Sequence, residues 1–229
     1  KSFGKNWMMN LGMTNYQILD NQPKCLAIGI CDQNDPYRLK PYMNFNGNWQ
    51  SKKSKINLNV DSEVVFFEHL QSESGKRIRN LTTLSKLFNF SGIEVRPAVA
   101  LDYAKFNPDS NEKNTDRTIP IYSLDIKANL IKITNDGDIR QSIQPRFMAV
   151  YIPFEDQSEF PFIDTLMPDF NYFQLFNENR FIGNDRIGDT SKISYGIVAK
   201  RTRIKSGKDF FEFTLGQTLH LKDEKVVMP

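Results

Sequence analysis

Apolar and polar residues alternate along most of this chain. In Tyr122–Leu130 every second residue is apolar, and the residues between them are polar or charged. Successive side chains of a β-strand point to opposite faces, so this stretch predicts a strand with one apolar and one polar face. A helix would scatter the same apolar residues around its axis.

The same alternation predicts about nine strands and an all-β fold. Two stretches are less regular. Residues 80–90 fit neither face well, and the stretch around Arg146 carries Met148, Val150 and Ile152 on the face that should be polar. The predicted strands lie near residues 6–19, 37–50, 54–68, 80–90, 92–106, 119–134, 139–153, 191–204 and 208–221.

Four prolines interrupt the alternating stretches: Pro41, Pro97, Pro145 and Pro153. Proline has no N–H group to donate to a strand ladder. We therefore expect bulges or interrupted pairing at these positions.

The connections between the predicted strands are of two kinds. Short, glycine-containing turns at 91–92, 135–138 and 205–208 are typical of antiparallel hairpins. Longer polar connections cover residues 20–36, 69–79, 107–118 and 154–190. Short turns at one end and long loops at the other are the pattern of an outer-membrane barrel, whose long loops lie outside the cell. The 154–190 loop is therefore predicted to be extracellular.

Strand length supports the same interpretation. Strands of globular proteins usually have about 5–6 residues, whereas most of these stretches run to about 11 or more. Eleven residues at about 3.3 Å each, tilted by about 40°, rise close to ~28 Å, which matches the apolar belt of a membrane barrel. A soluble β-sandwich that acts as a binding module is the alternative, since it explains the alternation equally well.

Composition excludes several classes of protein. The chain has 229 residues with a net charge of +3, which gives no support for nucleic-acid binding. The mean hydropathy is −0.50, and no run approaches 18 apolar residues, so a transmembrane helix is not predicted. Alternation lowers the hydropathy of barrel strands, so this value is compatible with a barrel. Because bacterial single-chain barrels have even strand numbers, nine strands predict an incomplete barrel, with residues 1–229 forming part of one barrel domain.

The residue types that form common catalytic and metal sites do not occur here with the spacing that such sites need. His69 and His220 lie far apart, and neither has metal-ligand spacing to another histidine or cysteine. Phosphate-binding loops and nucleophile motifs are absent from the sequence, so no enzyme, metal or cofactor is predicted. Cys25 and Cys31 lie six residues apart and could form a local disulfide or remain free thiols.

A series of motifs in the second half of the chain is more specific. They are Gln144–Phe147, Tyr151–Ser158, Asp164-Thr165, Pro168–Asn171, Leu175-Phe176, Asn179–Phe181, Asp185–Asp189 and Gly216-Gln217. In this order they resemble the barrel domain of the LPS-assembly protein LptD family, outer-membrane proteins of Gram-negative bacteria. The resemblance covers about residues 3–222.

The resemblance implies a function. It implies transport of lipopolysaccharide to the outer leaflet of the outer membrane, without a chemical reaction. It also implies partners: an LptE-like plug lipoprotein and periplasmic proteins that form a bridge for lipopolysaccharide. A porin-like channel for small solutes is the alternative within the same fold class.

Two sets of residues are candidates for function. The polar strand faces would line a lumen, whose cations could contact lipid phosphates or belong to a hydrated wall of mixed charge. The 154–190 loop is rich in aromatic residues that must be buried, so we expect it to fold over or into the barrel mouth as a lid. The candidate lumen cations are Arg38, Lys40, Arg96, Lys127, Arg146, Lys192 and Lys200, and the candidate loop anchors are Phe160, Phe170, Phe176 and Phe181.

Overall fold

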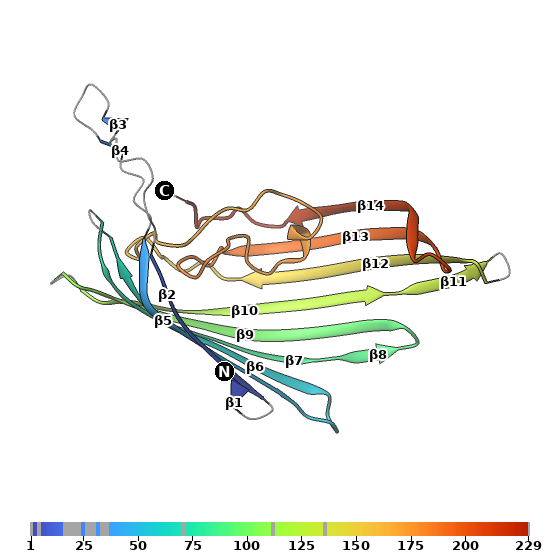
Figure 1. The fold of residues 1–229 in the computed structure, drawn as a ribbon, viewed down its shortest axis with the longest axis horizontal. Helices are drawn as coiled ribbons and strands as arrows, with labels where there is room; N and C mark the ends of the chain where they lie inside the picture. Colours follow the sequence, from blue (N-terminus) through green and yellow to red (C-terminus); the bar gives the residue numbers. More distant parts are fainter. Residues whose placement is uncertain are drawn as a thin grey trace.

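The described part of the chain forms one large curved antiparallel sheet. The computed structural model describes residues 2–3, 6–15, 24–25, 31–32, 37–69, 72–110, 113–134 and 137–228. Twelve strands belong to the sheet, and the long ones follow one another in chain order (Figure 1). The strands are β1 (Ser2–Phe3), β2 (Trp7–Thr14), β5 (Arg38–Gln50), β6 (Ile56–Glu68), β7 (Gly75–Lys86), β8 (Phe88–Phe90), β9 (Ile93–Pro108), β10 (Thr115–Ala128), β11 (Leu130–Thr134), β12 (Ile139–Ile152), β13 (Thr190–Arg203) and β14 (Lys208–His220).

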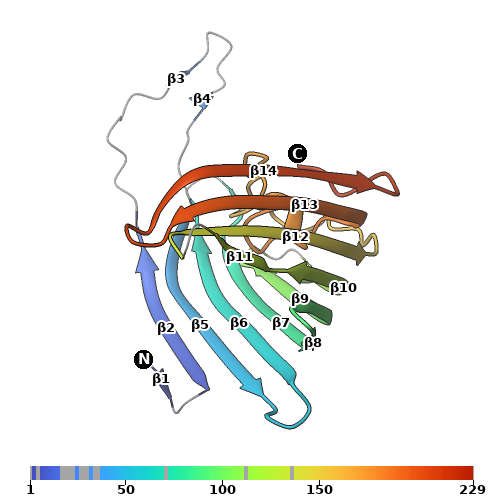
Figure 2. The same ribbon diagram turned by 90° about the vertical axis from the view of Figure 1, so that its right-hand side faces the viewer.

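The sheet curves through an arc but does not close. Figure 2 shows the strands following this arc, with the long loop between β12 and β13 inside the concave side. β1 and β2 lie at one edge and β14 at the other, and no pairing joins these edges among the described residues. A β-sandwich would need two facing sheets, so the single curved sheet does not support that alternative. No helix in the described ranges is long and apolar enough to cross a membrane.

Prolines divide two of the predicted strands. Pairing of β9 with β7 ends at Ala98 and resumes with β8 at Val95, so the break lies beside Pro97. On β12, pairing with β10 ends at Arg146 and resumes with β11 at Ile143, beside Pro145. These breaks follow from the missing proline N–H.

The other two prolines also disturb the ladder. The register between β5 and β6 shifts between Leu39 and Tyr42, around Pro41, and β12 ends directly before Pro153. The expectation of bulges and interrupted pairing is therefore confirmed, and the two breaks raise the strand count above the predicted nine.

Most strand boundaries agree with the predicted ones. The clearest error is β7, which begins at Gly75 rather than near residue 80. Its first residues include Arg77 and Arg79, which the alternation pattern treats as solvated charges rather than as strand residues. Both side chains are in fact buried against partners that the sequence pattern does not show. The predicted strand 6–19 is seen as β2, and residues 16–19 lie outside the described part.

Two short strands, β3 (Lys24–Cys25) and β4 (Cys31–Asp32), form a separate hairpin. Its backbone register places Cys25 opposite Cys31. The side chains of both cysteines lie outside the described part, so whether they form a disulfide is not tested.

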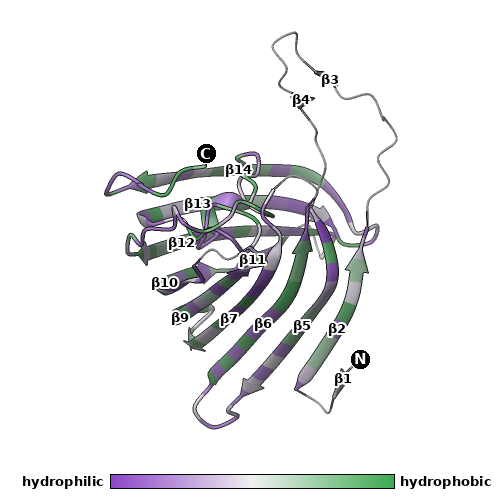
Figure 3. Cartoon of the chain, turned by 90° about the vertical axis from the view of Figure 1, so that its left-hand side faces the viewer, coloured by the Kyte–Doolittle hydropathy of each residue, from purple (hydrophilic) through white to green (hydrophobic). Residues whose placement is uncertain are grey.

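The two faces of the sheet differ in chemistry. Figure 3 shows hydrophilic and hydrophobic residues alternating along strands such as β5 and β9. The convex face carries a row of large apolar side chains that are 38% to 69% exposed. They include Leu11, Met43, Phe66, Leu84, Val99, Leu101, Tyr122, Tyr151, Tyr195 and Leu215. The concave face is polar except where the long loop covers it.

Candidate functional site

The candidate site is the concave face of the sheet together with the long loop, residues 153–189, that connects β12 to β13. The loop contains one short 3-10 turn, η1 (Gln174–Phe176), and a bridge between Leu166 and Ile182. Charged residues, apolar residues and the segment after β14 each hold the loop in place.

Arg77 is the centre of the first group of contacts. Its side chain projects from β7 and is 1% exposed. The guanidinium donates to Glu63 on β6 at 2.6 Å and to Asp164 of the loop at 2.6 Å. It also donates to Asp185, a second carboxylate of the loop. A planar fork of donors suits this arrangement, in which one cation joins two strands and two parts of the loop.

Asp185 also organises the backbone of the loop. Its Oδ2 accepts N–H groups from Ile163 at 2.8 Å and Asp164 at 2.5 Å. The same carboxylate therefore ties residues 163–164 to Arg77 on the sheet. Sheet and loop are joined here through the fully buried charge of Arg77. Burying such a charge costs free energy unless all of its carboxylate partners are present.

The pKa values of the two loop carboxylates move in opposite directions. Burial opposes the ionisation of Asp164, but the Arg77 guanidinium outweighs it and lowers the pKa of Asp164 to about 2. Burial raises the pKa of Asp185 to about 6, only partly opposed by Arg77.

A second charged group lies beside the first. Asp102 on β9 is fully buried and accepts from Arg79 at 2.7 Å and Arg117 at 3.4 Å. Arg117 reaches into the loop, where it donates to the carbonyls of Asn184 at 3.0 Å and Asp185 at 2.8 Å. This arginine therefore supplies hydrogen bonds to loop carbonyl groups that have no partner in a strand ladder.

Apolar packing holds the middle of the loop. Leu175, Phe176 and Ile187 form a core cluster with concave-face residues of β9, β10 and β12. Those wall residues are Ala100, Ile119, Ile121, Met148, Val150 and Ile152. The apolar residues that broke the alternation around Arg146 therefore face the concave side and are covered by the loop.

Two paired glycines let the loop approach the wall closely. Gly196 on β13 lies opposite Gly216 on β14. A Cβ atom at Gly216 would lie 2.5 Å from Leu175 Cδ1, and one at Gly196 would lie 2.8 Å from Tyr172 Cε2. Only glycine leaves room at these positions for the turn 172–176.

The chain after β14 folds back over the loop. The carboxylate of Asp189 accepts the N–H groups of Lys225 at 2.9 Å and Val226 at 2.9 Å. Arg180 donates to the Val226 carbonyl and pairs with Glu224 at 3.2 Å. The loop is thus held from the sheet side by Arg77 and Arg117 and from the other side by residues 224–226.

The four phenylalanines predicted as anchors are not equally placed. Phe160, Phe176 and Phe181 are each at most 6% exposed, whereas Phe170 is 78% exposed. Phe170 differs from the prediction because apolarity alone does not show which aromatic residues of a loop face the wall. Phe173 of the same loop is also exposed, at 80%.

The predicted lumen cations also separate into two groups. Arg96, Lys127, Arg146, Lys192 and Lys200 lie on the concave face. Arg96 and Arg146 share Asp125, at 2.9 Å and 2.8 Å, and Lys192 donates to the Asn177 carbonyl of the loop at 2.7 Å.

Arg38 and Lys40 do not lie on the concave face. Arg38 is paired in register with Glu68, and Lys40 contacts Glu68 at 2.8 Å. Glu68 shares the convex face with Phe66. The bulge around Pro41 shifts the register, and such a shift moves side chains to the opposite face, which explains the error.

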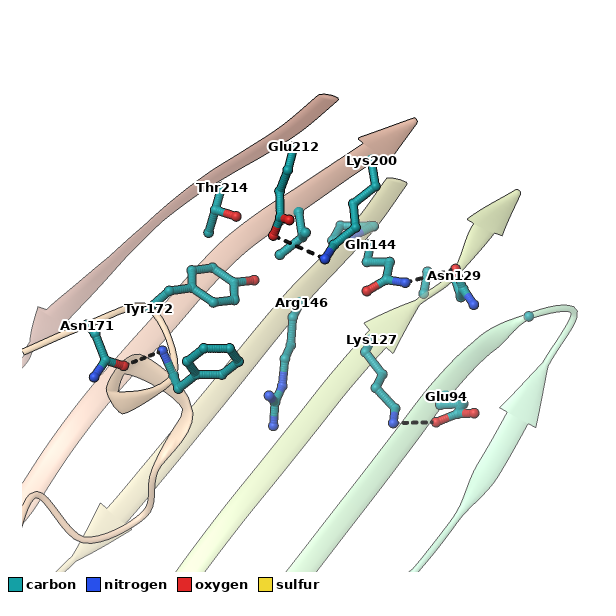
Figure 4. A pocket seen from close by; sticks show the side chains of 15 residues that line it. Glu94, Lys127, Asn129, Gln144, Arg146, Asn171, Tyr172, Lys200, Glu212 and Thr214 are labelled. Carbon is teal, nitrogen blue, oxygen red and sulfur yellow. Dashed lines mark hydrogen bonds and ion pairs between the residues drawn. The ribbon is translucent and has the colours of Figure 1, made fainter. Parts of the chain in front are cut away.

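A cavity of about 640 Å³ lies between the 171–173 turn of the loop and the concave wall (Figure 4). Three cations line it from β10, β12 and β13: Lys127, Arg146 and Lys200. Lys127 is paired with Glu94 at 3.0 Å and Lys200 with Glu212 at 3.1 Å. Amide, hydroxyl and apolar side chains complete the wall, among them Gln144, Thr214, Pro145 and Val198. Tyr172 and Phe173 border the cavity on the loop side.

The sequence pattern missed the buried ion pairs. Asp102 sits on the polar face of a predicted strand, whereas Arg77 and Arg117 lie in the stretches 69–79 and 107–118 that were predicted as polar connections. All three therefore looked like solvated charges. Asp185 lies within a motif of the family resemblance, which is the one signal that could have drawn attention to it. The pairing itself depends on long-range contacts. Arg77 is separated along the sequence from Asp164 by 87 positions and from Asp185 by 108 positions.

Comparison with known proteins shows which family this chain belongs to. The family model described as "LptD: LPS transport system D" matches residues 2–229. The chain belongs to the LptD family. Its similarity to individual members is moderate. It is 29% identical to the LPS-assembly protein LptD of Shewanella denitrificans, over 99% of this chain and 29% of that protein.

Two other relatives give the same picture. The chain is 28% identical to the LptD protein of Nitrosomonas eutropha, over 98% of this chain and 31% of that protein. It is 30% identical to the LptD protein of Nitrosomonas europaea, over 84% of this chain and 28% of that protein. The chain thus spans less than a third of the length of these LptD relatives.

Proposed function

We propose that this chain forms part of an outer-membrane β-barrel that delivers lipopolysaccharide to the outer leaflet. The observation that carries the proposal is the match of the whole chain to the LptD family, on a sheet with an apolar convex face and a polar concave face. The convex face exposes large apolar side chains on one strand after another, which supports contact with lipid.

The strands have the length needed for this placement. β5, β6 and β14 have 13 residues each, and β10, β12 and β13 have 14. Transmembrane strands tilted by about 45° need about 9–11 residues. In the proposed barrel, the concave face lines a polar lumen and the long loop is an extracellular lid.

The lumen cations on the concave face have a role in this proposal. Arg96, Lys127, Arg146, Lys192 and Lys200 would keep the passage hydrated and mixed in charge. Arg38 and Lys40 are left out because they lie on the other face. From the family resemblance we infer a plug lipoprotein and periplasmic bridge proteins as partners of the intact protein.

The membrane placement is tested by water accessibility. In the intact protein, with Cys25 and Cys31 replaced by serine, Leu101→Cys on the convex face should be protected from a water-soluble maleimide. Ala98→Cys, on the concave face of the same strand, should be labelled. Equal labelling of both residues would contradict the placement of β9 in a membrane.

The transport role is tested in cells that depend on this protein. Depletion should reduce the lipopolysaccharide that an impermeant surface probe can modify, while other outer-membrane proteins are still inserted. Unchanged surface lipopolysaccharide would refute the proposed function. Rapid flux of small solutes through the purified protein in liposomes would favour the porin-like alternative instead.

A further inference from the structure

The hairpin of β3 and β4 carries the only two cysteines of this chain. We propose that Cys25 and Cys31 form a disulfide that closes this hairpin, made by a protein thiol oxidant of the periplasm while the chain is in that compartment. The inference rests on the proposed function in one respect, because that function places the hairpin outside the cytoplasm. Disulfides persist in the periplasm and at the cell surface, whereas the cytosol keeps thiols reduced.

The hairpin belongs to the end of the sheet that carries the long loop (Figure 1). β12 is an even number of antiparallel steps from β2, so the two strands run in the same direction. The connections from β2 to β5 and from β12 to β13 therefore leave the sheet at the same end. Since the proposed function makes the loop between β12 and β13 extracellular, it makes the β3–β4 hairpin extracellular as well.

The backbone register of the hairpin carries the proposal. It pairs Lys24 with Asp32 and Cys25 with Cys31. Directly opposite residues of an antiparallel pair have Cα atoms about 4.5 or 5.5 Å apart, depending on whether the pair is hydrogen-bonded. A disulfide needs a Cα separation of about 4.4–6.8 Å, so both kinds of pair lie within its range. Opposite residues also share one face of the ladder, so the backbone needs no rearrangement to join them.

The sequence around the cysteines favours the same register. Lys24 and Asp32 carry opposite charges, and opposite charges at directly facing positions stabilise an antiparallel pair. Pairing that is shifted by one residue would place Cys25 opposite Asp32. The two cysteines would then lie on different faces of the hairpin.

Few other interactions support the hairpin. β3 and β4 contribute two residues each, and among the described strands they pair only with each other. An isolated two-stranded hairpin is marginally stable at best in water. A bond between Cys25 and Cys31 closes a loop of seven residues, 25–31. The entropy that this bond removes from the open chain favours the closed hairpin by roughly 50-fold.

The redox step balances with the oxidant protein alone. The thiolate of one cysteine attacks the disulfide of the oxidant and forms a mixed disulfide, from which the second thiolate releases the oxidant. The two cysteines together lose two electrons and two protons as the sulfur–sulfur bond forms. The disulfide of the oxidant is reduced to a dithiol.

Mass spectrometry of the intact protein tests the bridge directly. Free thiols are blocked with a maleimide before any reductant is added, and the protein is then digested with trypsin. Both cysteines lie on one tryptic peptide, 25–38, because no lysine or arginine occurs in it before Arg38. This peptide should carry no maleimide and should be two hydrogen masses lighter than the dithiol. Two maleimide groups on the peptide, or its attachment to a peptide from elsewhere in the protein, would overturn the proposal.

Variants separate the effect of register from mere nearness in the sequence. In a background with Cys25→Ser and Cys31→Ser, the pair Lys24→Cys with Asp32→Cys occupies the other directly opposite positions and should also form a bridge. The matched control keeps Cys25 and combines Cys31→Ser with Asp32→Cys, which puts the second thiol on the other face. In a glutathione redox buffer, the control should form its bridge with an equilibrium constant roughly tenfold smaller than that of Cys25 with Cys31. Equal constants would overturn the inference from the register.

Failure of this inference can be told apart from failure of the proposed function. Free thiols at both positions, in protein that delivers lipopolysaccharide to the surface, would overturn only the bridge. A bridge in protein whose depletion leaves surface lipopolysaccharide unchanged would overturn only the transport role.

Discussion

Replacement of Asp185 by asparagine is the sharpest test of how the long loop is held. The carboxylate accepts from Arg77 through one oxygen and from the N–H groups of Ile163 and Asp164 through the other. An amide has only one acceptor oxygen, so its NH₂ group must face one of these donors. The substitution therefore leaves at least one buried donor without a partner.

The expected cost follows from the burial of the site. Leaving a buried donor without a partner costs about 1–3 kcal/mol. The Arg77 guanidinium and two backbone N–H groups all donate to this side chain, so we take the upper figure of ~3 kcal/mol. At about 1.4 kcal/mol per factor of ten, the equilibrium for loop opening should rise by roughly 100-fold.

Hydrogen exchange of the intact protein measures this opening directly. Amides within 157–187 should exchange roughly 100-fold faster in Asp185→Asn, while amides of β9 and β10 should not change. Asp169→Asn is the matched control, because Asp169 is an exposed carboxylate of the same loop. Unchanged exchange in the loop would refute the role of Asp185, and equal acceleration in the strands would show general unfolding instead of loop release.

Three further predictions concern the same loop. Gly216→Ala should displace the 172–176 turn, because the new Cβ would lie 2.5 Å from Leu175 Cδ1. The cost of about 1–3 kcal/mol in loop docking should appear as faster proteolysis of the loop. Unchanged cleavage would contradict the close approach. Loop docking should be strongest near pH 4 when hydrogen exchange is corrected for its intrinsic pH dependence. Because the pKa of Asp185 is raised, its contribution to the stability of the docked loop is lost as the pH rises through about 6. Because the pKa of Asp164 is lowered, its contribution is lost as the pH falls through about 2. A steady increase in loop protection from pH 4 to pH 7 would have the wrong sign. Deletion of residues 158–184 should increase entry of large antibiotics into cells if the loop is a lid, and normal exclusion by a properly assembled protein would count against that role.

Strand positions could be predicted well because they depend on local chemistry. Tyr122–Leu130 shows its two faces through the period of two that the strand backbone imposes. Pro97 and Pro145 indicated interrupted pairing through the missing N–H group, and the breaks lie in the strands paired beside them, between β7 and β8 and between β10 and β11. The family resemblance rested on a series of loop motifs, including the Asp185–Asp189 segment that proves to contact both the sheet and the loop.

The contacts of the candidate site could not be predicted in the same way. Met148, Val150 and Ile152 looked like an irregular strand because the pattern contained no sign of the loop that covers them. Arg38 and Lys40 were assigned to the wrong face because one shift of register reverses the direction of every side chain beyond it.

The sequence by itself determined the all-β fold, the two chemically distinct faces and the long loop, because each follows from neighbouring residues. The tertiary structure alone decided that Arg77 meets Asp164 and Asp185, and that Gly196 and Gly216 receive the turn of the loop. These residues come together only through the path of the loop inside the curved sheet. Burial there turns charges that look solvated in the sequence into partners that must be paired.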